Sequence, residues 1–217
     1  MRTNFGTFMN MNTPILDVRF FATDSGNEPV REWLKTLPAG ERRTIGEDIK
    51  TVQFGWPLGM PLVRKMAKDL WEVRIHLMDR IARVLFTVVG HTMVLLHGFI
   101  KKSQAPPRRT RRRQAASATT QERLMNKHIG SSFDDFLADE AVLEETTAVA
   151  IKRVVAWHIA QEMKAQHLTK TALAEKMHTS RAALNRLLDE TDTSLTLTTL
   201  TSAAKALGKN LRIELTA

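Results

Sequence analysis

The stretch between residues 70 and 104 constrains the fold of this chain more than any other part of the sequence. It reads LWEVRIHLMDRIARVLFTVVGHTMVLLHGFIKKSQ and is rich in the β-branched and apolar residues that strands favour. We predict three successive β-strands separated by the short turns Met78-Asp79 and Gly90-His91: Leu70–Leu77, Arg80–Val89 and Met93–Ile100. A β-sheet is therefore expected at the centre of this part of the chain.

A two-residue turn at Met78-Asp79 also predicts the cross-strand partners of the first hairpin, because the register follows from counting. The apolar partners all fall on one face: Trp71 with Phe86, Val73 with Val84, and Ile75 with Ala82. On the other face Arg74 lies across from Arg83. Like charges in that position destabilise a sheet, and guanidinium groups bind phosphate well, so the pair suggests a bound polyanion. Two solvated surface residues are the alternative.

The residues before this sheet predict one strand and two helices. The strand is expected at Ile15–Phe21, where the sequence ILDVRFF alternates. One helix is expected to begin at Pro29 and end before Pro38, and a second to span Glu41–Phe54. Pro57–Lys68 is expected to be a loop that brings a further basic group near the paired arginines: Arg64, Lys65 and Lys68.

The sequences LWEVRI, RIARVLF and LLHGFIKKSQ resemble the phage-derived branch of the RelE- and HigB-related toxins of bacterial toxin–antitoxin modules. The resemblance covers residues 13–104 and implies an α+β fold, with two helices on a twisted antiparallel sheet. It also implies cleavage of ribosome-bound mRNA by basic residues, without a metal or other cofactor. The related ParE branch poisons DNA gyrase on a similar fold, so the fold alone leaves the target open.

Candidate catalytic residues follow from the same resemblance. In this family a 2′-hydroxyl attacks the neighbouring phosphate, which requires a proton acceptor, cations for the developing charge and a proton donor. Arg74 and Arg83 would stabilise the phosphate, and three residues would transfer protons or bind RNA: Lys65, His97 and Lys101. A three-residue loop in the last hairpin would place His97 beside Arg83, whereas a two-residue loop would place it opposite Val84 in the core.

The chain departs from these toxins after Gln104. The family usually continues as KTP-x-x-EI-x-x-A, a C-terminal helix, but this chain reads APPRRTRRRQAAS. We interpret residues 105–126 as a basic linker, with a phosphate-binding arm as the alternative, and residues 1–12 as a disordered tail. Residues 1–113 carry 20 Lys and Arg against 10 Asp and Glu, whereas residues 114–217 carry 12 against 13. The basic first part therefore suits a nucleic-acid partner better than the second part does.

The sequence that begins at Met125, MNKHIGSSFDDFLADE, resembles the start of a second reading frame that would encode the antitoxin of the same module. We therefore predict an antitoxin domain at residues 127–217. Six carboxylates and no Lys or Arg lie between Asp134 and Glu145. This segment is expected either to cover a basic groove of the toxin or to form an ordinary solvated helix of the antitoxin. Attachment in one chain would raise its effective concentration to roughly the millimolar range.

The sequence LTKTALAEKMHTSRAALNRLLD, Leu168–Asp189, resembles the helix-turn-helix of XRE-class repressors and HigA-type antitoxins. His178 stands where the turn usually has glycine, and His tolerates positive φ better than most residues. Ser180 is expected to cap the recognition helix. In such motifs the start of the recognition helix reads bases in the major groove. The candidate base contacts are Thr179, Ser180, Arg181 and Asn185, the candidate phosphate contacts are Lys170 and Thr171, and Arg186 could serve as either.

An all-α helix-turn-helix domain with a short C-terminal strand is therefore expected. Its other helices are predicted at Thr146–Gln166 and Leu197–Leu207, the latter ended by Gly208. The strand Leu211–Leu215 is expected to pair with a second copy and form a homodimer.

Several classes of protein are excluded by composition. The chain has no cysteine, so it forms no disulfide and no thiolate metal site, and a reducing cytoplasm suits it. No apolar run approaches the roughly 20 residues that span a bilayer, so no membrane partner is expected. No paired carboxylates, metal ligands or nucleophile with its base rise above chance, so we expect no metal and no cofactor.

Three functions remain open. The first is a fused toxin–antitoxin protein, in which an mRNA-cleaving toxin acts at the ribosome and is restrained by an antitoxin that binds operator DNA and regulates its own transcription. The second is a DNA-binding regulator with a catalytically decayed toxin domain, which the missing C-terminal helix favours. The third is a ParE-like gyrase poison with a linked antitoxin.

Overall fold

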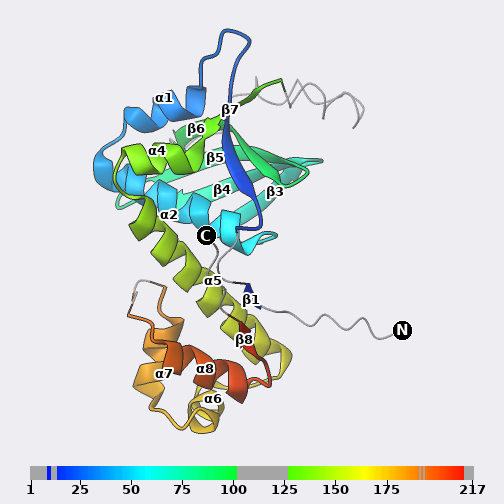
Figure 1. Ribbon diagram of the computed structural model, residues 1–217, viewed down its shortest axis with the longest axis vertical. Coiled ribbons are helices and arrows are strands. Elements are labelled where there is room, and N and C mark those ends of the chain that lie inside the picture. The colour runs from blue at the N-terminus through cyan, green and yellow to red at the C-terminus, as the bar shows by residue number, and fades with distance from the viewer. Residues whose placement is uncertain (1–8, 11–13, 102–126, 191, 193, 213–217) are drawn as a thin grey trace. The chain divides into compact units, whose positions relative to one another are not determined.

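The computed structural model in Figure 1 describes residues 9–10, 14–101, 127–190, 192 and 194–212. They form two compact units, which are described separately. The first comprises Ile15–Thr146, and the second comprises the chain from Thr147 together with the N-terminal residues up to Pro14. The predicted basic linker and nearly all of the predicted tail lie outside the described residues.

The first unit is built on a six-stranded mixed sheet with the strand order β3-β4-β5-β6-β2-β7. The strands are β2 (Asp17–Phe21), β3 (Val63–Ala67), β4 (Leu70–His76), β5 (Ile81–Val89), β6 (Thr92–Lys101) and β7 (Ile129–Ser132). The three strands predicted between residues 70 and 104 are confirmed as β4, β5 and β6. The sheet is not wholly antiparallel as expected, because β2 pairs with β6 in parallel.

Three helices lie against one side of this sheet (Figure 1). Helices α1 (Pro29–Lys35) and α2 (Ala39–Gly55) confirm the two predicted helices, and α4 (Phe133–Asp139) follows β7. The core between helices and sheet includes the predicted apolar pairs, whose register is confirmed residue by residue from Trp71 with Phe86 to Ile75 with Ala82. The segment 57–68, expected to be a loop, contains β3 instead. Its sequence VRKMA is exposed at four of five positions, so it has no apolar alternation to reveal an edge strand.

A β-bulge lies between β5 and β6. The turn at Gly90-His91 contains two residues, because Val89 pairs with Thr92, and Gly90 adopts a positive φ of 59°. Phe86 pairs with Leu95 but Leu85 pairs with His97, so Leu96 is the extra residue. Beyond the bulge, the pairing of β6 with β5 is shifted by one residue. Each β6 side chain there points to the opposite face of the sheet from the one that it would occupy without the bulge.

The first unit extends beyond the expected toxin boundary at residue 104. Residues 129–146, expected in the antitoxin domain, add β7 to the edge of the sheet beside β2 and place α4 over the core. The physical reason is apolar burial, since Phe133, Phe136 and Leu137 are at most 1% exposed. The compact unit therefore joins sequence from both predicted domains.

The second unit is mainly helical. Its helices are α5 (Leu143–Ala165), which begins in the first unit, α6 (Lys170–Lys176), α7 (Arg181–Leu188) and α8 (Leu197–Ala206). A small core forms between them, and Trp157 of α5 lies outside it with 37% of its surface exposed. The C-terminal strand β8 (Leu211–Arg212) pairs in parallel with β1 (Met9–Asn10) of the same chain, and its pairing with a second copy stays a prediction. No helix among the described residues is long and apolar enough to cross a membrane.

Candidate nucleic-acid interfaces

The strand registers place most of the predicted catalytic residues on one face of the sheet. Arg74 pairs with Arg83, and the residues that alternate with them, Val73 and Val84, are fully buried in the core on the opposite face. The same alternation along β3 and β6 adds further residues to this face. We call it the polar face; its described members are Arg64, Glu72, Arg74, Arg83, His97 and Lys101.

A buried ion pair joins β4 and β5 on the polar face. Glu72 is 1% exposed and Arg83 is 8% exposed, and Nη1 of Arg83 donates a hydrogen bond to Oε2 of Glu72 at 2.6 Å. This carboxylate offsets the repulsion between Arg74 and Arg83. The sheet itself therefore supplies an anion beside the two guanidiniums, and the binding of a polyanion at this face stays a prediction.

Three atoms around this ion pair have no hydrogen-bond partner among the described residues: Nε of Arg74, Nε of Arg83 and Oε1 of Glu72. A buried polar group without a partner costs about 1–3 kcal/mol. Both guanidiniums therefore keep hydrogen-bonding capacity that the described residues do not use, although these particular Nε atoms are buried. Arg64, which pairs with Glu72 across β3 and is exposed, adds a further cation to the same face.

His97 lies on the polar face because of the β-bulge. A two-residue turn alone would have placed it opposite Val84 in the core, and a three-residue loop would have placed it beside Arg83. The structure combines a two-residue turn with the bulge at Leu96, so His97 pairs with Leu85. Its half-buried imidazole stacks on Phe99, with ring centroids 5.6 Å apart.

The two lysines predicted beside the arginines are placed differently. Lys101 is exposed at the end of β6, where it pairs with Ile81 on the polar face. Lys65 pairs with Trp71 on the opposite face, and its ammonium lies 5.9 Å from the centroid of a Trp71 ring. The structure therefore does not bring Lys65 to the arginines, and Arg64 occupies the neighbouring position instead.

Glu72 was missing from the predicted site. Glu72 had a usable signal, because it stands two residues before Arg74 in the strand LWEVRI and must share its face. Arg64 was predicted near the paired arginines, but in a loop; it lies instead on β3, where it pairs with Glu72.

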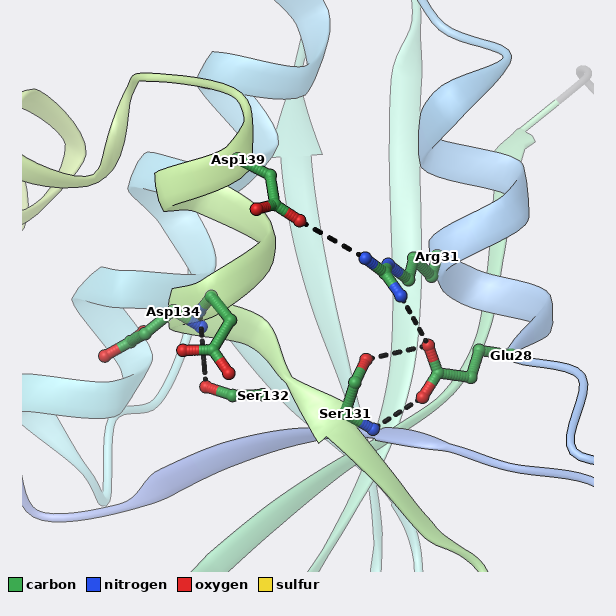
Figure 2. Close-up of polar contacts among 7 residues, drawn as sticks. Glu28, Arg31, Ser131, Ser132, Asp134 and Asp139 are labelled. Atoms are coloured by element: carbon green, nitrogen blue, oxygen red, sulfur yellow. Dashed lines mark hydrogen bonds and ion pairs between the residues drawn. The ribbon is translucent and has the colours of Figure 1, made fainter.

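The acidic segment does not cover the polar face. Its carboxylates instead pair with cations of α1 and α2 on the helix side of the sheet, and Figure 2 shows one such pair, Asp139 with Arg31. The pairs are Asp134 with Lys50 at 3.0 Å, Asp139 with Arg31 at 3.4 Å, Glu140 with Arg42 at 2.7 Å, and Glu145 with Arg43 at 2.8 Å. The segment was expected either to cover a basic groove of the toxin or to form an ordinary solvated helix. It does bind basic residues, but these lie on α1 and α2 and not on the polar face.

The second unit contains the predicted helix-turn-helix, formed by α6 and α7. Thr169 caps α6 by accepting a hydrogen bond from Ala172 N, and Ser180 caps α7 by accepting one from Ala183 N. His178 adopts a φ of 51° in the turn, which confirms that it takes the left-handed conformation usually left to glycine. Leu173, Ala174, Leu184 and Leu187 are buried between the helices.

The structure brings the seven candidate DNA contacts to the surface around α6 and the start of α7. Thr179 is half-buried and the other six are exposed: Lys170, Thr171, Ser180, Arg181, Asn185 and Arg186. Nζ of Lys170 lies 3.2 Å from Oδ1 of Asn185, which connects the two helices across this surface. The arrangement presents a cation and an amide at the position from which a recognition helix reads base edges.

A buried lysine that sequence reasoning missed holds the end of α7. Lys152 of α5 is 3% exposed, and its ammonium donates hydrogen bonds to the carbonyl oxygens of Arg186, Leu187 and Asp189 at 3.0, 2.9 and 3.1 Å. These carbonyls end the helix, where its dipole favours a cation. Burial lowers the pKa of Lys152, an effect that Asp192 and Asp189 oppose.

Two parts of the chain match known protein families. Residues 32–121 match the family described as phage derived protein Gp49-like, and residues 159–213 match the helix-turn-helix family. The chain joins a Gp49-like domain to a helix-turn-helix domain. This pairing of domains supports a toxin–antitoxin fusion with a role in transcription regulation. Neither a curated protein nor a solved structure gives a match to the chain.

Proposed function

We propose that the chain is a toxin–antitoxin fusion whose Gp49-like unit cleaves mRNA at the ribosome and whose helix-turn-helix unit represses its own transcription. The observation that supports the first activity most directly is the polar face. It holds Arg64, Arg74 and Arg83 together with an imidazole and a lysine on neighbouring strands. Both targets, message and operator, would be met in the cytoplasm.

The proposed reaction is attack of a ribose 2′-hydroxyl on the adjacent phosphate, without a metal. Arg74 and Arg83 would donate hydrogen bonds to the phosphate oxygens as negative charge develops on them. His97 would accept or donate a proton, since an imidazole does either near neutral pH. Arg64 and Lys101 would bind the flanking phosphates.

Primer extension on a translated message tests this activity. The purified full chain is added to programmed ribosomes, and we expect cleavage that falls about 10²- to 10³-fold with Arg74→Ala. Arg80→Ala is the matched control, because Arg80 lies beside the same hairpin but donates to both carboxylate oxygens of Glu41 at 2.7 and 2.8 Å. Equal cleavage by both variants would reject the polar face as the site, and DNA damage with intact message would indicate a gyrase poison.

The second candidate, a DNA-binding regulator with a decayed toxin domain, is favoured by the buried pair of Glu72 and Arg83. A guanidinium that already binds a carboxylate at 2.6 Å has less to offer a phosphate. The same primer-extension experiment separates the two functions. Intact message with the wild-type chain, combined with retained operator binding, supports the regulator.

We propose that the helix-turn-helix unit binds the operator as a homodimer, with α7 of each copy in the major groove of one half-site. Binding to a duplex from upstream of the chain's own reading frame is measured by fluorescence anisotropy, and sedimentation gives the stoichiometry. Arg181→Ala is expected to weaken binding by about 1–3 kcal/mol. Lys164→Ala, an exposed cation of α5, serves as the control. Unchanged binding by Arg181→Ala would remove Arg181 from the interface.

A further inference from the structure

The segment from β7 to the start of α5 is attached to the Gp49-like unit through the core as well as the surface. The ring of Phe20 on β2 is fully buried and packs edge-on against Phe133 and Phe136, both at a centroid distance of 5.6 Å. Leu137 is 1% exposed and belongs to the same core as Ile45 and Ile49 of α2. Without this segment, the apolar groups beneath it would lose their cover.

Two glycines make this close packing possible, one on each side of the contact. An added Cβ at Gly130 of β7 would lie 3.0 Å from the carbonyl oxygen of Phe20 and would overlap the carboxylate of Glu28. An added Cβ at Gly46 of α2 would lie 3.0 Å from Cδ2 of Leu137. The two surfaces are therefore shaped for each other at both ends of the segment.

Polar contacts set the register of the segment on its acceptor (Figure 2). The carboxylate of Glu28 accepts hydrogen bonds from both the backbone N–H and the hydroxyl of Ser131. Ser132 caps α4 by accepting from the backbone N–H groups of Asp134 and Asp135. Asp134 then binds the ammonium of Lys50, which is only 2% exposed and lies over the ring of Phe54.

We propose that residues 129–146 are a structural part of the Gp49-like unit, not a removable inhibitor. They occupy the helix side of the sheet and its β2 edge, where their carboxylates pair with cations of α1 and α2. Within the described part of the chain they make no such pairs on the polar face, where Glu72 is the carboxylate that binds Arg83. Loss of the C-terminal part of the chain therefore unfolds the Gp49-like unit and does not release an active toxin.

The inference rests on the contacts within the first unit, and it gives the proposed fusion a specific regulation. A releasable antitoxin leaves a folded toxin behind when a protease destroys it. Here the same protease would remove a strand, a helix and three buried apolar side chains from the toxin-like fold. Proteolysis of the second half would therefore also unfold the first.

Cleavage of the full chain at a protease site inserted within residues 105–126 tests this dependence without any activity assay. We expect the two fragments to co-elute in gel filtration, and hydrogen exchange of β2 and α2 to stay as slow as in the uncut chain. Fragments that separate while the N-terminal one stays monodisperse, with β2 and α2 still protected, would overturn the proposal. This readout is independent of RNA cleavage, so failure of the proposed function would not affect it.

Two neighbouring carboxylates provide a matched pair of variants for the cut chain. Asp134→Ala removes the partner of the buried Lys50 and is expected to raise the dissociation constant of the fragments about a hundredfold. Asp135→Ala changes the same residue type on an exposed face of α4 and is expected to leave it unchanged. Equal dissociation constants for both variants would show that the ion pair does not hold the segment, and would overturn this part of the proposal. Gly130→Val, which fills the space against Phe20, is expected to separate the fragments.

Discussion

Single residues decide where the backbone of this protein can come close to another group. Gly98 is fully enclosed in β6, opposite Val84, and an added Cβ there would overlap the indole of Trp33 on α1. This explains why glycine stands between His97 and Phe99, whose side chains both point to the other face. The HGF sequence thus combines a packing requirement at Gly98 with a residue of the polar face, His97, and the ring of Phe99 that stacks on it.

Gly98→Ala is expected to destabilise the first unit by about 1–3 kcal/mol, because the rigid indole has to move. Urea unfolding followed by tryptophan fluorescence measures this, since Trp33, Trp56 and Trp71 all lie in that unit. Gly40→Ala near the start of α2 is the control. Nothing lies within 4 Å of the Cβ that this change adds, so the free energy of unfolding of the first unit should rise slightly or stay unchanged. Equal midpoints for the two variants would contradict the packing argument.

His158 makes the second unit sensitive to pH. Burial lowers the pKa of its imidazole below the ordinary value of 6.5, with Glu162 opposing the effect. The unfolded chain therefore binds the proton more readily, so the second unit should lose stability as the pH falls below about 6.5. Hydrogen exchange of α5 and α8 at pH 7.5 and pH 5 measures the loss, which His158→Gln should reduce. An equal loss in the variant would assign the effect to another group.

At the scale of elements, α7 depends on a helix that precedes the DNA-binding motif. Three carbonyl oxygens at its end accept hydrogen bonds from Lys152 of α5. Lys152 is buried and binds backbone carbonyls at the end of α7, so it would act on DNA binding by positioning the helix and not by contact. The caps at Thr169 and Ser180 hold the other ends of the motif.

Lys152→Met is expected to weaken operator binding and to leave its salt dependence unchanged. Loss of a phosphate contact would reduce the slope of log affinity against log salt concentration by about 1, and Lys152 is not expected to make such a contact. Amides at the end of α7 should exchange faster with solvent in the variant. Lys164→Met, also on α5 but exposed, is the control. A reduced salt slope for Lys152→Met would mean that this lysine contacts DNA after all.

At the scale of the whole molecule, the two proposed activities belong to different compact units. Arg74 lies on the sheet of the first unit and Arg181 on the recognition helix of the second. Residues without shared partners usually contribute independently to a measured free energy. The boundary between the units falls near Thr146, whereas the sequence suggested a boundary in the basic stretch at residues 105–126. Each proposed activity is therefore assigned to one of these two units.

The double variant Arg74→Ala/Arg181→Ala is therefore expected to combine the two single effects. Message cleavage should match that of Arg74→Ala, and operator affinity should match that of Arg181→Ala. Both are measured on the full chain by the assays above. A change of more than about 0.5 kcal/mol in operator affinity caused by Arg74→Ala alone would show that the units are coupled.

Local patterns in the chain were sufficient for the elements and for the first hairpin. Alternation and turn residues predicted β4, β5 and β6 and the pairing of Arg74 with Arg83, because these depend on neighbours a few residues apart. The helix-turn-helix was predicted from its resemblance to XRE-class repressors, and the cap at Ser180 from its side chain. Packing between distant segments decided the rest. The bulge at Leu96 moved His97 out of the core, Glu72 reached Arg83 across the sheet, and residues 129–146 joined the first unit, since only the assembled core shows which apolar surfaces remain to be covered.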